Sequence, residues 1–246
     1  RGPKLDNAQH LAFTLALGPI EQAIGTSLRA VEDNRLSTDF ADVSNLDKED
    51  KPFERQDRRR LFAIGNRLWH SDSSFKTTPA KYSLLHAHSI PRKGGNTEFA
   101  DMRAAYDALD ADMKQQVEGL ICEHSQIYSR GKIGFTDLTD EERARFAPVR
   151  QVLVRSHPVT GRKSLYLSSH AGSVLGQPGP EGNIFLQDLI EHATQRQFVY
   201  AHEWKVDDLL IWDNRCTNHA RTDFPAEEQR KLRRYTVSEP DAPVQT

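Results

Sequence analysis

Two residues that can bind a metal ion stand two positions apart in the segment Leu68-Trp69-His70-Ser71-Asp72. On an extended segment, residues i and i+2 point to the same side, so His70 and Asp72 can bind one ion together. A histidine from far downstream would complete a face of two histidines and one carboxylate, which leaves about three of six octahedral positions open for substrate and O₂. Taken alone, a His-x-Asp pair is a weak signal, because it often arises by chance.

A second group of chemically competent residues lies near the other end of the chain. An apolar strand expected over 209–213 is followed by His219, Arg230 and Arg234. The two arginines are four residues apart, so on one strand they share a face. Two guanidinium groups on an inward face are costly to bury unless anionic ligands neutralise them. A basic surface strand, continued by Arg233, is the alternative, and these residues alone leave both interpretations open.

Hydrophobic spacing and capping residues predict the elements that must position these groups. Helices are expected from Asp6 to about Leu17, over 102–119 and over 180–194. Strands are expected over 81–90, 96–100, 151–157, 163–168, 197–205, 209–213 and 231–237. The highly charged segment 29–60 is interpreted as a lid-like loop, with a solvated surface excursion as the alternative. Many strands without regular βαβ alternation predict a mainly β domain over 1–246, a sandwich or open barrel with flanking helices.

Composition narrows the class of protein. Apolar residues make up 37% and charged residues 28% of the 246 residues, which excludes disorder as the main state. The net charge of −2 gives no basic field for nucleic acid or an anionic membrane, and no apolar run reaches the roughly 18 residues of a membrane span. The cysteines Cys122 and Cys216 are too few for a disulfide framework or a thiolate metal cage. We therefore expect a cytoplasmic protein; whether it forms a homo-oligomer is left open.

A further signal comes from several segments taken together. They are LWHSDSSF, GGNTEFADMRAAYDAL, HPVTGRKSLYL, EHATQRQFVYAHEW, and LLIWDNRCTNHA followed by R-x-x-x-R. In combination they resemble the Fe(II)/2-oxoglutarate-dependent dioxygenases of the taurine dioxygenase family, and within it the 2,4-dichlorophenoxyacetate (aryloxyalkanoate) dioxygenase branch. The resemblance implies a double-stranded β-helix, or jelly roll. Because members begin with further strands, it also implies that roughly forty residues of the fold precede Arg1.

The resemblance implies roles for individual positions. The iron ligands would be His70, Asp72 and His219. The distal carboxylate of 2-oxoglutarate would meet the hydroxyl of Thr97 and a forked salt bridge from Arg230. The substrate anion would lie near Arg234, and the remaining substrate-pocket positions would be Asn66, Ser73 and His170.

These roles imply that the chain uses O₂ to hydroxylate a small organic anion, such as an aryloxyalkanoate, while 2-oxoglutarate is decarboxylated to succinate and CO₂. One alternative is the same machinery acting on a sulfonate or an alkyl sulfate ester. The others are a zinc-type metallohydrolase and a non-catalytic ligand-binding jelly roll. A hydrolase needs a metal-bound water and a general base but no arginines for a dicarboxylate, so Arg230 and Thr97 favour the oxygenase. Two positions depart from the pattern of that branch. Phenoxyacetate-cleaving members carry a histidine where this chain has Ser173, and the run Ala220–Asp223 also differs from theirs. Both departures bear on which substrate is used and leave the cofactor-binding residues unchanged.

Overall fold

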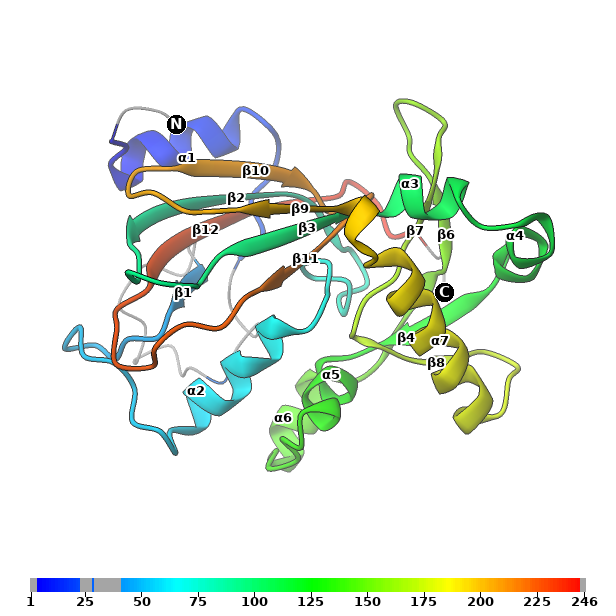
Figure 1. Ribbon diagram of the computed structural model, residues 1–246, viewed down its shortest axis with the longest axis horizontal. Helices are drawn as coiled ribbons and strands as arrows, with labels where there is room; N and C mark the ends of the chain where they lie inside the picture. Colours follow the sequence, from blue (N-terminus) through cyan, green and yellow to red (C-terminus); the bar gives the residue numbers. More distant parts are fainter. Residues whose placement is uncertain (1–3, 23–27, 29–40, 244–246) are drawn as a thin grey trace.

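The computed structural model describes residues 4–22, 28 and 41–243. Their strands form a four-stranded antiparallel sheet in the order β1-β12-β2-β10. Its members are β1 (Ala41–Ser44), β12 (Lys231–Ser238), β2 (Ala80–Ser89) and β10 (Leu209–Asp213). A three-stranded sheet with the order β11-β3-β9 lies beside it (Figure 1). It contains β11 (Thr217–Arg221), β3 (Thr97–Asp101) and β9 (Val199–His202).

Two smaller sheets lie on the other side of the molecule (Figure 1). The first, in the order β5-β4-β8, contains β5 (Val149–Val152), β4 (Ile121–His124) and β8 (Ala171–Val174). The second is the pair β6 (Val154–Ser156) and β7 (Lys163–Leu165). The helical elements are α1 (Asn7–Leu15), α2 (Arg58–Ala63), η2 (Ile64–Arg67), α3 (Met102–Asp107), α4 (Ala111–Val117), α5 (Gln126–Lys132), α6 (Asp140–Arg145), α7 (Gly179–Ala193) and η3 (Arg196–Phe198).

Apolar side chains of the two larger sheets pack against each other and form the core beside the cavity described below. One buried apolar cluster there contains Leu85 and Ala87 of β2, Leu232 of β12, and the two tryptophans Trp204 and Trp212. The even spacing of Leu85 and Ala87 puts both on one face of β2, as expected for a strand with a buried face. A separate and larger apolar cluster joins α3 and α7 to β4, β7 and β8. The sequence prediction of strands with flanking helices is confirmed at the level of a mixed architecture.

Local signals placed several elements correctly. Asp6 begins α1 through a reciprocal capping box, in which the Asp6 carboxylate accepts from the Gln9 backbone and the Gln9 amide accepts from the Asp6 backbone. The strand predicted over 81–90 is β2, and the last predicted strand is β12. The predicted helix over 180–194 is α7, although Ile184, expected on its buried side, is 63% exposed.

Other expectations were wrong. The segment 102–119 forms two short helices, α3 and α4, because the Asp110 carboxylate accepts a hydrogen bond from the Met113 backbone and begins a new helix. Helices α5 and α6 were not predicted. The lid-like loop expected over 29–60 stays a prediction, because residues 29–40 lie outside the described residues. In the rest, residues 41–44 form strand β1 and residues 58–60 begin α2, whereas residues 45–57 lie in no helix or named strand.

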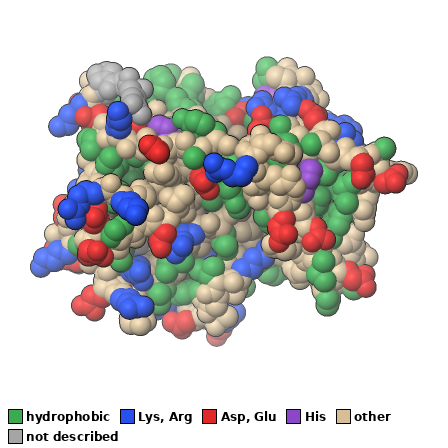
Figure 2. Space-filling model, in the orientation of Figure 1, with side chains coloured by type: hydrophobic (Ala, Val, Ile, Leu, Met, Phe, Trp, Pro, Cys, Tyr) green, Lys and Arg blue, Asp and Glu red, His purple; other side chains and the backbone are tan. Residues whose placement is uncertain are grey.

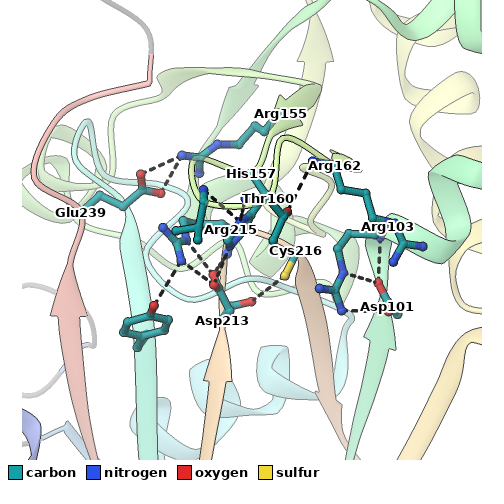
Figure 3. A network of polar contacts seen from close by, with 12 residues as sticks. Asp101, Arg103, Arg155, His157, Thr160, Arg162, Asp213, Arg215, Cys216 and Glu239 are labelled. Atoms are coloured by element: carbon teal, nitrogen blue, oxygen red, sulfur yellow. Dashed lines mark hydrogen bonds and ion pairs between the residues drawn. The ribbon is translucent and has the colours of Figure 1, made fainter. Parts of the chain in front are cut away.

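A network of ion pairs joins the ends of the central strands to the β6–β7 hairpin (Figure 3). Asp213, at the end of β10, accepts from Arg215 at 2.6 Å and from His157 Nε2 at 3.1 Å. Arg155 of β6 pairs with Glu239, just after β12, at 2.7 Å. These contacts connect the β6–β7 pair to the four-stranded sheet, which carries part of the candidate site.

The surface agrees with the near-neutral composition. On the face shown in Figure 2, basic and acidic side chains are interspersed. None of the described helices has both the length and the apolar character that crossing a membrane requires.

Candidate active site

His70 and His219 face each other across a β-bridge. The His70 amide donates to the His219 carbonyl at 2.9 Å, and the His219 amide donates to the His70 carbonyl at 2.8 Å. His219 belongs to β11, which pairs with β3 in regular antiparallel register. The two imidazole ring centroids are therefore only 4.2 Å apart, although the residues come from opposite ends of the chain.

Asp72 completes a cluster with the geometry of a metal site. One ligand atom from each of His70, Asp72 and His219 lies within 4.8 Å of the other two, and all three residues are buried. The Oδ2 atom of Asp72 is 3.8 Å from Nε2 of His219. The sequence-based expectation that these three residues converge is thus met by the geometry.

The protonation states of the cluster suit metal binding. Burial by itself would raise the pKa of Asp72, but Arg234, His219 and His70 together hold that pKa at about 2. Burial, assisted by His70, lowers the pKa of His219 to about 3, and burial also lowers the pKa of His70. At neutral pH the site therefore presents two neutral imidazoles and one carboxylate, the forms that bind a divalent cation.

Hydrogen bonds set the orientation of two of the three ligands, His70 and Asp72. Nδ1 of His70 is 2.7 Å from the Leu68 carbonyl, which only accepts, so Nδ1 carries the proton and Nε2 keeps a free lone pair. Ser83 donates to Oδ2 of Asp72 at 2.7 Å. Such partners fix ring and carboxylate orientation around a metal. The donor set and its orientation therefore fit an Fe(II)-type two-histidine, one-carboxylate centre.

A network of hydrogen bonds that the sequence did not reveal holds Asp72 in place. Asn214 accepts from the Asp72 backbone at 3.1 Å and from the Trp212 indole at 3.0 Å. Its amide donates to Ser83 at 2.9 Å, and Ser83 then donates to Asp72. Ser83 lies within β2 and Asn214 directly follows β10, so only the folded sheet brings them together.

Arg230 and Thr97 form a second polar corner of the same cavity. Nε of Arg230 donates to the Gly95 carbonyl at 3.0 Å, and no described carboxylate forms an ion pair with this guanidinium, which is 3% exposed. Burial and the nearby Arg221 lower its pKa to about 9, so it remains charged at neutral pH. The Thr97 hydroxyl accepts from the Trp204 indole at 3.0 Å, which leaves its own proton to donate. This corner fits a carboxylate ligand.

The other predicted site residues also border the cavity, which has a volume of about 420 Å³. Arg234, on β12, forms an ion pair with Asp72. The Ser73 hydroxyl donates a hydrogen bond to the Glu21 carboxylate at 2.8 Å, and Ser73 has a positive φ of 54°. Asn66 lies at the end of the η2 turn, and the His170 ring is 5.8 Å from the His70 ring. All nine predicted residues therefore line one cavity: Asn66, His70, Asp72, Ser73, Thr97, His170, His219, Arg230 and Arg234.

A second group of possible ligands has a different character. His157, Asp213 and Cys216 also present ligand atoms within 4.8 Å of one another (Figure 3). However, both Asp213 oxygens already accept from Arg215, and burial raises the pKa of the Cys216 thiol. This group serves the structural network rather than a metal.

Comparisons with known proteins agree with this site. Residues 1–236 match the family model described as "Taurine catabolism dioxygenase TauD, TfdA family". The chain is 43% identical to the alpha-ketoglutarate-dependent 2,4-dichlorophenoxyacetate dioxygenase of Cupriavidus pinatubonensis, over 96% of this chain and 82% of that protein. It is 37% identical to the (S)-phenoxypropionate/alpha-ketoglutarate-dioxygenase of Sphingobium herbicidovorans, over 92% of this chain and 76% of that protein.

A solved structure is also similar to this chain. The crystal structure of AAD-2 in complex with Mn(II) and N-oxalylglycine superposes with a TM-score of 0.96. Its sequence is 52% identical, and the match covers 98% of this chain and 83% of that one.

Proposed function

We propose, given that this chain belongs to the taurine catabolism dioxygenase TauD, TfdA family, that it is an Fe(II)/2-oxoglutarate-dependent dioxygenase that hydroxylates a small aryloxyalkanoate. The observation that carries the proposal is the convergence of His70, Asp72 and His219 in one cavity with Arg230. We further propose that the sheets are those of a double-stranded β-helix, with the site between them.

Different residues of the site would bind the metal and 2-oxoglutarate. His70, Asp72 and His219 would hold Fe(II), which, when bound with 2-oxoglutarate, supplies the oxidising power for hydroxylation by O₂. The Arg230 guanidinium and the Thr97 hydroxyl would bind the distal carboxylate of 2-oxoglutarate. Each charge-assisted hydrogen bond there contributes about 1.5–3 kcal/mol.

The substrate would occupy the rest of the cavity. We propose that Arg234 attracts the substrate carboxylate, while Asn66, Ser73 and His170 form the pocket wall. The buried side chains of Ser73 and His170 would help to exclude water from the reacting carbon, which limits side reactions. Hydroxylation at a carbon that bears an ether oxygen gives a hemiacetal-type product, which collapses to a phenol and an oxo acid.

An aryloxyalkanoate is proposed because the two relatives described above are named for such substrates. A sulfonate or an alkyl sulfate ester is the second candidate, since Arg234 can attract either kind of anion. A panel of phenoxyacetates, phenoxypropionates, taurine and alkyl sulfates, measured by succinate formation, would separate these candidates.

The reaction class has a direct test. Protein loaded with Fe(II) is expected to consume O₂ and form succinate from 2-oxoglutarate, faster when the correct substrate is present. Asp72→Ala should abolish this activity, whereas Asp188→Ala, an exposed carboxylate on α7, should leave it unchanged. Full turnover with Zn(II) as the sole metal would refute the proposal.

A further inference from the structure

Arg130 is a buried cation in the cavity wall that the roles above do not use. It lies in α5, is 3% exposed, and borders the same cavity as the metal-site residues. Among the described residues, no carboxylate pairs with it. Burial lowers its pKa to about 10, so the guanidinium is charged at neutral pH.

The guanidinium is held in place by a hydroxyl that has no spare hydrogen-bonding capacity. Nη1 of Arg130 is 2.9 Å from Oγ of Ser129, and Nδ1 of His170 is 2.9 Å from the same atom. Ser129 gives its own proton to the Gln126 carbonyl at 3.1 Å. A hydroxyl has one proton and two lone pairs, so Arg130 and His170 both donate to Ser129.

Two neighbours on the other side shape the space around Arg130. Its guanidinium carbon lies 4.3 Å from the centre of the Phe62 ring, a cation–π distance. A Cβ added at Gly65 would lie 2.7 Å from that same carbon, so glycine is needed for this close packing. The remaining polar contacts are weak, because Asn66 accepts at 3.4 Å and the buried Nε has no partner among the described residues.

The neighbours of Arg130 neutralise its buried positive charge only in part. Neutral hydrogen-bond partners and one aromatic face offset only part of the several kcal/mol that burying a charged group costs. An anionic ligand would supply the missing counter-charge. Arg130 differs from the other two arginines of the cavity. Arg234 already pairs with Asp72, and both Arg230 and Arg234 reach the cavity from the β12 segment, whereas Arg130 reaches it from α5.

We propose that Arg130 is a second anion-binding group of the substrate pocket and that it binds a carboxylate of the primary substrate. The site lies next to the metal centre, because His170, which shares Ser129 with Arg130, has its ring 5.8 Å from that of His70. The inference rests on the proposed function for the identity of the substrate. The carboxylate is either the single acidic group of a monoanion, which Arg130 would bind together with Arg234, or the ring carboxylate of a dianion, and the test separates these two sources.

The test measures binding of matched probes by calorimetry, with O₂ excluded, to protein loaded with Fe(II) and 2-oxoglutarate. The probes are phenoxyacetate, 4-carboxyphenoxyacetate and the neutral phenoxyacetamide. Arg130→Met is expected to weaken acid binding about 10- to 100-fold while changing amide binding by less than about threefold. Arg130→Lys should retain part of the affinity, and Arg143→Met, an exposed arginine on α6, should change nothing.

The pattern of losses identifies the carboxylate that is bound. A loss for both acids places the phenoxyacetate carboxylate at Arg130, and a loss for the dianion alone places the ring carboxylate there. Equal losses for acids and amide, or no loss for any probe in a folded variant, would overturn the proposal.

Two further measurements keep the result independent of folding and of the cofactors. Gly65→Ala retains the charge but displaces the guanidinium, so it should also weaken acid binding selectively. The same titrations on the metal-free protein test Arg130 directly. If the wild-type chain binds neither Fe(II) nor 2-oxoglutarate, the proposed function fails, whereas charge-selective loss in Arg130→Met would still support the anion site.

Discussion

Replacing Arg230 with methionine should have opposite effects on stability and on cofactor binding. The side chain is buried, donates through Nε to Gly95, and has no carboxylate partner among the described residues. In the ligand-free protein it is therefore a buried charge that no described carboxylate neutralises. With 2-oxoglutarate bound, it would be half of a forked salt bridge. Methionine has a similar length and no charge, so Arg230→Met separates these two contributions.

The expected magnitudes follow from the contacts. Two charge-assisted hydrogen bonds, at about 1.5–3 kcal/mol each, correspond to a loss of roughly 10²- to 10⁴-fold in 2-oxoglutarate affinity. Replacing a buried ion pair by well-packed apolar side chains is often neutral or stabilises by about 1–4 kcal/mol, and we expect the same direction for a buried guanidinium that no described carboxylate neutralises. For a chain of this size, 1 kcal/mol shifts the Tm by roughly 2–4 °C. The ligand-free variant should therefore melt at or above the wild-type temperature.

Thermal unfolding with and without 2-oxoglutarate measures both effects in one experiment. The wild type should gain stability as 2-oxoglutarate is added, and Arg230→Met should gain much less. Arg196→Met, whose side chain is 86% exposed, is the control for removing a surface arginine. A variant that melts well below the wild type yet binds 2-oxoglutarate with unchanged affinity would refute the reasoning.

Three other outcomes are expected. Ser83→Ala removes a 2.7 Å hydrogen bond to Asp72 and should weaken Fe(II) binding about 10- to 100-fold in a metal titration; unchanged affinity would exclude this orienting role. Arg234→Met should weaken the primary substrate but not 2-oxoglutarate, measured as separate KM values, and identical effects on both would contradict the division between the two arginines. Burial, assisted by His86 and His88, lowers the pKa of His10 to about 4, below its ordinary 6.5. The unfolded chain therefore binds a proton at His10 more readily than the folded chain does. The contribution of His10 to the free energy of unfolding is complete above about pH 6.5 and is lost as the pH falls towards 4. His10→Phe should flatten the dependence of Tm on pH in this window, and an unchanged slope would argue against it.

Local sequence signals predicted elements whose hydrogen bonds are local. The signals for the Asp6 cap, for strand β2, which Pro91 ends, and for the end of α7 lie within a few residues, so these elements could be recognised without the fold. The same logic explains an error: Asp110 is itself a capping residue, and its hydrogen bond to Met113 divides the segment expected to form one helix. Helical spacing of apolar residues continued through that break and concealed it.

The sequence by itself determined which ligand types were available, because a His-x-Asp pair, a distant histidine and two spaced arginines limit the chemistry whatever the fold. Tertiary structure alone decided that His70 and His219 face each other across a β-bridge, and that Ser83 and Asn214 support Asp72. It also decided that Arg130 is buried beside the metal site, which no local pattern indicated. The physical reason is that pairing and burial depend on which distant segments pack together, and that choice is made by the whole chain.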